Sequence, residues 1–262
     1  MGKTIFRFEM KRQLIPFCLW TAALIGVLWG LMAGVYPTFQ ESAADIQKVV
    51  EGFPPQFAAA FGVNISDIFS FGGYYSFCFA YLGVMGAIMA ASVGISIFSR
   101  ERRAQCSDFL MTKPVSRGRI FTWKLVSGLF ILTAANVIYL IAAAAIGRAN
   151  DTPMMAAGLS LLMTQLVFFA LGIFYAVFAK RVRSVSGAAT AFGFGAFLLS
   201  ALYNIIGEEA LRVLVPLKYF EPAAVFNQGR YEMRYALMGC FVGVVCLLSA
   251  YIRYTQSDIR AI

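Results

Sequence analysis

The sequence contains no histidine, and only 13% of its residues are Asp, Glu, Lys or Arg. Without an imidazole the chain can form neither a Ser-His-Asp triad, nor a histidine-ligated metal site, nor a histidine proton relay. Soluble domains average about 25% charged and about 45–50% apolar residues, whereas this chain is 60% hydrophobic. The composition therefore excludes a soluble enzyme, a disordered protein and a nucleic-acid-binding protein, in spite of a net charge of +9.

Motifs for metal, disulfide and nucleotide chemistry are also missing. The five cysteines form no CxxC pair, so we expect small buried hydrophobic side chains rather than a zinc or disulfide framework. Gly2-Lys3-Thr4 resembles the end of a phosphate-binding loop, but the preceding strand and first glycine of that motif are absent. No pair of carboxylates lies within an apolar run, which argues against an ion-coupled carrier and an intramembrane protease.

Six long apolar windows dominate what is present. A membrane-spanning helix needs about 20 apolar residues, and none of these windows contains Asp, Glu, Lys or Arg. The windows are 17–36, 76–98, 125–147, 156–179, 186–206 and 235–252. We therefore predict an all-α membrane protein, a six-helix transmembrane bundle that forms a single domain over residues 1–262.

The basic residues between the windows predict the orientation. Six spans place both termini on one side, and the segments on that side hold 16 of the 22 Lys and Arg residues but 4 of the 13 acidic ones. Because basic loops stay in the cytoplasm, both termini are expected to be cytoplasmic. The first window is too long for a cleaved signal and is interpreted as an anchor. Topology and anionic lipid account for the positive charge without nucleic acid.

The longest segment on the predicted cytoplasmic side, 99–124, has two open interpretations. Ser107 or Asp108 can cap a short helix with an apolar tip at Phe109 and Leu110, and Pro114 ends it. Such an element suits docking to a soluble partner. A loop whose basic residues contact lipid headgroups fits equally well.

Two other features also leave alternatives. Lys3, Arg7 and Lys11 recur at helical spacing, which is typical of an interfacial helix but also fits an extension of the first span. Asn136 and Gln165 lie within spans, where they line a substrate path or hydrogen-bond between helices. Small residues at four-residue spacing, from Gly86 to Gly94 and from Gly187 to Gly195, permit close helix contacts within the bundle or across a dimer.

Three stretches together resemble a known family. The first stretch, 101–124, contains Glu101, Phe109-Leu110, the Lys-Pro-Val-Ser-Arg run of 113–117 and Lys124. The second stretch is the Lys-Tyr-Phe-Glu-Pro run of 218–222. The third is Tyr254 followed by Asp258-Ile259. This pattern is similar to the membrane subunit of an ABC-2 type ABC transporter. It departs from that family at Gln105-Cys106, where Gly-Thr is usual.

The resemblance implies a transporter made of membrane and ATPase subunits in the cytoplasmic membrane of a bacterium. A separate ATPase subunit would bind ATP and Mg, while this chain holds no cofactor or metal and catalyses nothing. Docking to the ATPase is implied for a coupling helix between the second and third spans, with a second contact at the N-terminal helix (Lys3, Arg7 and Lys11). The residues implied in the coupling segment are Glu101, Arg102, Arg103, Asp108, Phe109, Leu110, Lys113, Pro114 and Arg117. The chain would pair with itself or a related permease and move a substrate outward, and the alternatives are an ATP-independent scaffold or channel and a membrane-embedded enzyme.

Overall fold

The computed structural model describes residues 2–52, 54, 67–103, 116–150 and 153–256. Within these ranges the secondary structure is helical without strands, and six helical segments are long and apolar enough to cross a membrane. The first segment consists of α1 (Gly2–Trp29), a π-helical stretch η1 (Gly30–Val35) and α2 (Tyr36–Glu41). The others are α5 (Phe71–Arg103), α7 (Arg117–Asn150), α8 (Met154–Phe178), α9 (Val185–Ile206) and α12 (Met233–Gln256). The prediction of an all-α six-helix bundle is confirmed.

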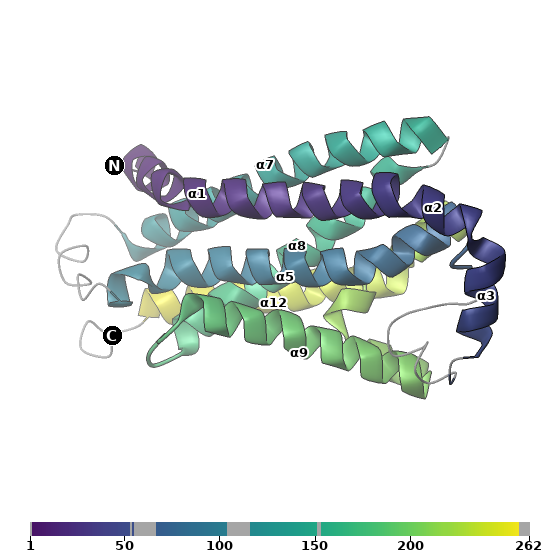
Figure 1. Ribbon diagram of the computed structural model, residues 1–262. Helices are drawn as coiled ribbons and strands as arrows, with labels where there is room; N and C mark the ends of the chain where they lie inside the picture. The colour runs from purple at the N-terminus through teal and green to yellow at the C-terminus, as the bar shows by residue number, and fades with distance from the viewer. Residues whose placement is uncertain (1, 53, 55–66, 104–115, 151–152, 257–262) are drawn as a thin grey trace.

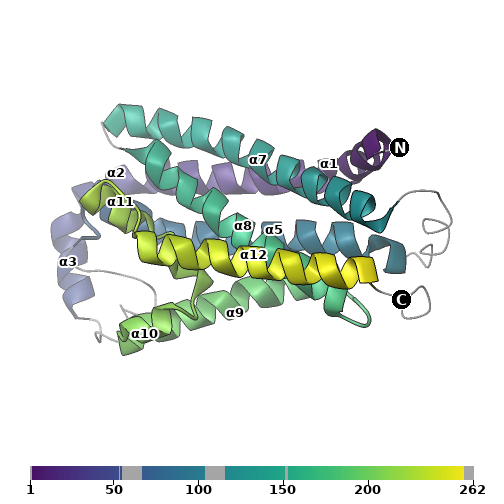
Figure 2. The same ribbon diagram turned by 180° about the vertical axis from the view of Figure 1, so that it is seen from behind.

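Helices α5 and α8 form the centre of the bundle. In their apolar windows 67% and 61% of the residues are buried, against 17% in the first segment and in α12. Helices α1 and α7 lie side by side on one flank, α9 packs on α5 at the other, and α12 runs along α8 (Figures 1 and 2). The outer helices therefore expose large apolar side chains such as Leu19, Ile141 and Leu198, as expected for a protein solvated by lipid.

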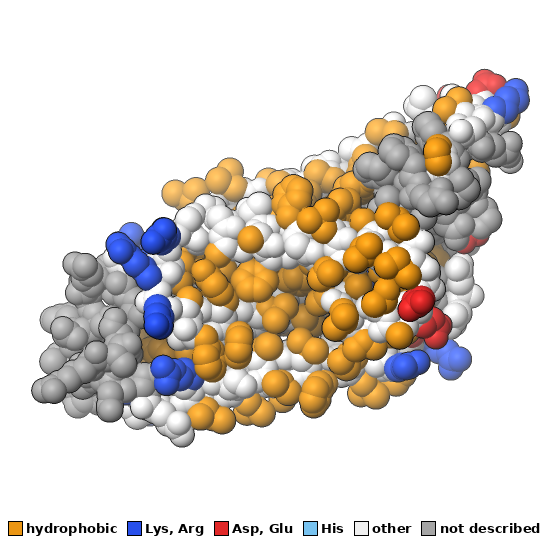
Figure 3. Space-filling view, turned by 90° about the horizontal axis from the view of Figure 1, so that it is seen from below, with side chains coloured by type: hydrophobic (Ala, Val, Ile, Leu, Met, Phe, Trp, Pro, Cys, Tyr) orange, Lys and Arg blue, Asp and Glu red, His pale blue; other side chains and the backbone are white. Residues whose placement is uncertain are grey.

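The two ends of the bundle differ in charge and structure. Helix α1 begins and α12 ends at one end, here called the terminal end (Figure 1). The opposite end, here called the far end, carries α3 (Ala43–Glu51), α10 (Glu209–Arg212) and α11 (Pro222–Gln228). On the face shown in Figure 3, Lys and Arg appear at both ends, apolar side chains cover the middle, and acidic groups appear only toward the far end.

Helices α5 and α7 are longer than a bilayer requires. They contain 33 and 34 residues, so each is about 50 Å long at 1.5 Å per residue, whereas the hydrocarbon core is about 30 Å thick. The extra turns at the terminal end carry Arg100 and Arg103 on α5 and Arg117 and Arg119 on α7. These helices extend beyond the predicted windows because the windows contain only uncharged residues, whereas the helical backbone continues through the charged residues at its ends.

Glycines bring the two central helices into close contact. A Cβ at Gly172 of α8 would lie 2.7 Å from the Ala91 carbonyl oxygen of α5, and one at Gly94 would lie 2.8 Å from the Phe169 carbonyl oxygen. The small-residue stripe of the second span is therefore used within the bundle. By contrast, a Cβ at Gly195 of α9 would meet nothing within 4 Å, so this position makes no such contact with another described helix.

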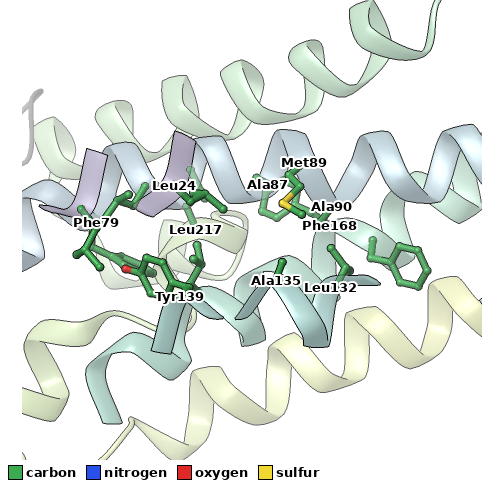
Figure 4. Close-up of a cluster of buried hydrophobic side chains, with 14 of the residues drawn as sticks. Leu24, Phe79, Ala87, Met89, Ala90, Leu132, Ala135, Tyr139, Phe168 and Leu217 are labelled. Atoms are coloured by element: carbon green, nitrogen blue, oxygen red, sulfur yellow. The ribbon is translucent and has the colours of Figure 1, made fainter. Parts of the chain in front are cut away.

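The connection between α9 and α12 folds back into the bundle. Helix α9 ends at Ile206 and is capped by Gly207, whose φ of +74° favours glycine. A 3-10 turn η2 (Pro216–Lys218) follows α10. Leu217 of η2 is 8% exposed and points among core side chains that include Leu24, Phe79 and Tyr139 (Figure 4). The far end is thus closed by a folded segment whose apolar side chains are part of the core.

Candidate functional site

An ion pair joins α1 to α5 at the terminal end. Arg100 Nη1 donates to Glu9 Oε2 at 2.6 Å, and the Glu9 side chain is only 1% exposed. The guanidinium also lies 5.8 Å from the centre of the Phe8 ring. Because a buried carboxylate is costly unless it is paired, this contact fixes the start of α1 against the last turns of α5.

Lys124 joins α7 to α5 at the same end. It is 1% exposed, its Nζ donates to the Ile97 carbonyl at 2.9 Å, and it lies 5.6 Å from the Phe98 ring centre. Phe98 and Phe121 are 4.9 Å apart, and the Tyr254 ring of α12 lies 5.5 Å from Phe121. The ends of α1, α5, α7 and α12 are therefore connected around the point where α5 leaves the bundle and α7 enters it.

The predicted docking residues lie at or beyond this point. Arg103 is exposed at the end of α5, with its Nε 3.1 Å from Ser99 Oγ, and Arg117 is half-buried at the start of α7. Glu101 and Arg102 belong to α5, and only their backbone is described. The remaining predicted residues lie outside the described part of the chain; they are Asp108, Phe109, Leu110, Lys113 and Pro114. The structure thus brings Arg103 and Arg117 to the same end of the bundle.

The predicted second contact lies on α1. Lys3, Arg7 and Lys11 are all exposed, while Glu9 and Gln13 between and beside them are buried. Helix α1 continues through Pro16 into the first span without interruption, although its first turns are tilted relative to the rest (Figure 1). A proline removes one backbone hydrogen bond and is a common cause of such a bend.

Asn136 and Gln165 contact each other in the middle of the bundle. Asn136 Nδ2 donates to Gln165 Oε1 and to the Leu132 carbonyl, and Gln165 Nε2 lies 3.7 Å from Met89 Sδ. The two amides are 2% and 0% exposed. The pair therefore connects α7 and α8 beside α5.

Arg212 organises the far end. It is 7% exposed and donates two hydrogen bonds to Glu232, at 3.0 and 2.9 Å, and two to the Lys218 carbonyl. Its guanidinium carbon lies 3.9 Å from the centre of the Tyr235 ring. Burial by itself lowers the pKa of Arg212, but the bond to Glu232 and the charges of Glu221 and Glu232 outweigh it, so the pKa is raised above its ordinary value.

A comparison with family profiles decides the class of the protein. The profile described as "ABC-2 family transporter protein" matches residues 4–259, nearly the whole chain. The chain belongs to the ABC-2 transporter family. It is therefore a permease of an ABC transporter, and permeases of this family generally work with a cytoplasmic ATPase. A search of the curated proteins found no match.

The contact between Asn136 and Gln165 leads to a first prediction for the permease. If the pair serves helix packing, Asn136→Leu should lower stability by about 1 kcal/mol, because buried interhelical hydrogen bonds contribute about 0.6–1.7 kcal/mol. A double-mutant cycle with Gln165→Leu, measured by thermal unfolding of the purified protein in detergent, should give a coupling energy in that range. A coupling energy of zero would instead favour the substrate-path interpretation.

The sequence interpretation missed the ion pairs at both ends of the permease. Glu9 is the single acidic residue before the first window, and it stands four residues before Gln13 on the buried face of α1. That spacing is a weak signal for a buried polar stripe. Arg212 and Glu232 are 20 residues apart, and no local pattern connects them, because their contact depends on the chain folding back between α9 and α12.

Proposed function

We propose that this permease is the membrane subunit of an ATP-driven exporter that moves its substrate outward. A separate ATPase binds ATP and Mg, hydrolyses the nucleotide and docks at the terminal end, which is the cytoplasmic side. The observation that carries the proposal is the meeting of α5 and α7 at this end. Both helices extend past the bilayer thickness there and flank residues 104–115.

The charge distribution supports the orientation. The terminal end carries Lys and Arg (Figure 3), and the segments on that side hold 16 of the 22 basic residues. Because basic segments tend to be retained in the cytoplasm, this charge distribution supports an intracellular terminal end. An ATPase that binds cytoplasmic ATP would then meet the long ends of α5 and α7.

The contacts at the terminal end supply a route for coupling. Lys124 holds α7 to α5, and the pair of Glu9 with Arg100 holds α1 to α5. A force applied between α5 and α7 therefore acts on three helices together. An ATPase that binds two conformations with different affinity shifts the permease between them, which is how a chain without a nucleotide site draws on ATP.

The packing of the centre supports a paired permease. Backbone atoms of α5 and α8 meet at Gly172 and Gly94, and Asn136 bonds to Gln165 between α7 and α8. A substrate path through this closely packed centre would require the helices to separate. We therefore place the path at the surface of the bundle, between this permease and a second copy or a related chain.

A double substitution in the predicted coupling helix between the second and third spans tests the proposal. Phe109→Glu with Leu110→Glu should leave the amount of membrane-inserted permease unchanged and reduce the ATPase activity that copurifies with it at least tenfold. The reason is that burying two unpaired carboxylates in an apolar contact carries a large desolvation cost. The measurement is ATP hydrolysis by tagged permease isolated gently from its native membranes. Val49→Glu, on the exposed far-end helix α3, is the matched control and should behave as the wild type.

Two results would contradict the proposed function. One is undiminished copurifying ATPase activity in the double variant. The other comes from an impermeant thiol reagent added to intact cells, with each variant made in a background without the native cysteines. Labelling of Ser116→Cys, rather than of Ser42→Cys, would contradict the proposed orientation. Ser116 and Ser42 are exposed at the terminal end and at the far-end side of the first span, respectively.

A further inference from the structure

A cavity of about 140 Å³ lies at the far end of the bundle, between α5, α9 and the segment from η2 to α11. Its inner wall is apolar. Phe79 and Leu217, which belong to the core shown in Figure 4, form part of this wall together with Ala80, Gly83 and Phe197. A cavity of this size holds a group about as large as one benzene ring. The cavity can therefore receive the apolar part of a small molecule.

Two polar side chains of α9 line the same cavity. Ser200 and Asn204 are four residues apart, so they lie on one face of the helix. Ser200 is 8% exposed, and neither side chain forms a hydrogen bond with a residue in the described part of the chain. Ser76, on the α5 side of the cavity, differs because its hydroxyl donates to the Gly72 carbonyl at 2.7 Å, as serines inside helices commonly do. The hydroxyl of Ser200 and the amide of Asn204 are thus available to a ligand.

A buried hydroxyl without a partner gives the apolar cavity a chemical preference. Removing such a group from water costs free energy unless a new hydrogen bond replaces those to water. A ligand that bonds to Ser200 offsets this cost, whereas a hydrocarbon leaves it in place. A few convergent polar groups on an otherwise apolar lining are typical of sites for small molecules.

The charged residues of the wall favour a neutral ligand. Lys218 Nζ lies 2.6 Å from Glu221 Oε1, and Arg212 Nη2 lies 3.8 Å from Glu221 Oε2. Both carboxylate oxygens of Glu221 therefore already face a cation, and Lys218 is engaged by the same carboxylate. Asp67 is exposed, where solvent screens its charge. An ion that entered the apolar cavity would lose its hydration without gaining a free counter-charge.

We propose that this cavity binds a compact neutral molecule that carries a hydroxyl or amide group. The apolar body lies against Ala80 and Gly83, and the polar group bonds to Ser200, with Asn204 one helical turn away as a second partner. This inference goes beyond the proposed exporter function. Because equilibrium binding requires no ATPase, either one can fail without the other.

Three probes of similar size separate these properties. Para-fluorobenzyl alcohol is neutral and forms hydrogen bonds, para-fluorotoluene lacks the hydroxyl, and para-fluorobenzylamine is protonated at neutral pH. Fluorine NMR titrations of the purified full-length permease in nonionic maltoside micelles, corrected with protein-free micelles, measure their binding. We expect saturable binding of the alcohol, with at least threefold higher affinity than that of the amine.

Two substitutions test the site itself. Ser200→Ala should weaken binding of the alcohol at least threefold because one hydrogen bond is lost, and should leave binding of para-fluorotoluene unchanged. Ala201→Phe should weaken binding of both neutral probes at least tenfold, because the added ring fills the cavity that Ala201 lines. The melting temperature of each variant shows whether it is folded.

Matched controls separate the site from general effects on the protein. Ser42→Ala removes an exposed hydroxyl at the end of α2, and Ala191→Phe adds a ring to the exposed face of α9; both should bind the alcohol like the wild type. The proposal is overturned if the folded wild type shows no saturable binding of the alcohol, or if the amine binds equally well. It is also overturned if Ser200→Ala leaves the affinity for the alcohol unchanged or lowers the affinity for both neutral probes equally, or if folded Ala201→Phe retains full affinity.

Discussion

Arg212→Met should destabilise the permease by about 3 kcal/mol, which is at the low end of the range of about 3–5 kcal/mol for breaking a buried ion pair. The low end applies because Glu232 keeps 34% of its side chain exposed. The substitution preserves much of the side-chain volume but removes four hydrogen bonds, two to Glu232 and two to the Lys218 carbonyl. It also removes the cation from the face of Tyr235.

The consequence extends over the whole far end because Arg212 connects elements that are distant in sequence. Its partners lie in η2 and immediately before α12, while Arg212 itself ends α10. The loss should therefore release the folded-back connection, including Leu217 in the core. Thermal unfolding of the purified protein in detergent measures the effect.

Arg234→Met provides the matched control for this substitution. Arg234 is exposed, and its guanidinium lies 5.7 Å from the same Tyr235 ring, so the same chemical group is lost from an exposed position. We expect a change of less than about 0.5 kcal/mol there. Adding Glu232→Leu to Arg212→Met should recover part of the loss, because the orphaned carboxylate is removed. Equal melting temperatures for Arg212→Met and Arg234→Met would refute the role of Arg212.

Gly172→Leu should prevent normal packing of the two central helices. A Cβ at this position would lie 2.7 Å from the Ala91 carbonyl oxygen and 2.9 Å from Ala91 Cα. These are backbone atoms, so no rotamer change relieves the overlap, and the helices must move apart. We expect a loss of about 3 kcal/mol or more, at or above the upper end of the usual cost of overpacking, and a sharp fall in the yield of folded protein on size-exclusion chromatography.

Two comparisons make the Gly172 prediction specific. Gly195→Leu places the same side chain where nothing lies within 4 Å of the added Cβ, so it should leave folding intact. Ala91→Gly combined with Gly172→Leu should give no rescue, because the overlap involves the backbone of residue 91 rather than its methyl group. Full rescue, or normal yield of Gly172→Leu alone, would show that α5 and α8 are not in backbone contact.

The structure adds contacts beside the predicted docking residues that bear on the proposed coupling. Arg103 and Arg117 flank residues 104–115, and the proposed coupling would pass through the contacts of Glu9, Arg100 and Lys124. Lys124 was recognised in the sequence as part of a family pattern. Its burial, and its bond to the Ile97 carbonyl, give that pattern a physical reason: the lysine holds the two helix ends on either side of the segment.

The amino-acid sequence by itself determined the class of the protein. Six uncharged apolar windows specify six helices able to span a membrane, because each charge at mid-bilayer costs about 2.5–3.5 kcal/mol on insertion scales. The Lys-Pro-Val-Ser-Arg run and the six-span plan also led to the family that the profile over residues 4–259 confirms. Both signals are local in sequence, so they can be read without coordinates.

Only the tertiary structure decided which side chains meet. It assigned the Gly86-to-Gly94 stripe to contacts with α8, paired Asn136 with Gln165, and placed Arg212 beside Glu232. Every helix in a bilayer is apolar on all sides, so its sequence lacks the polar stripe that would reveal the buried face of a soluble helix. Which face is buried then depends on packing and on polar contacts between residues far apart in the chain, and those exist only once the bundle has formed.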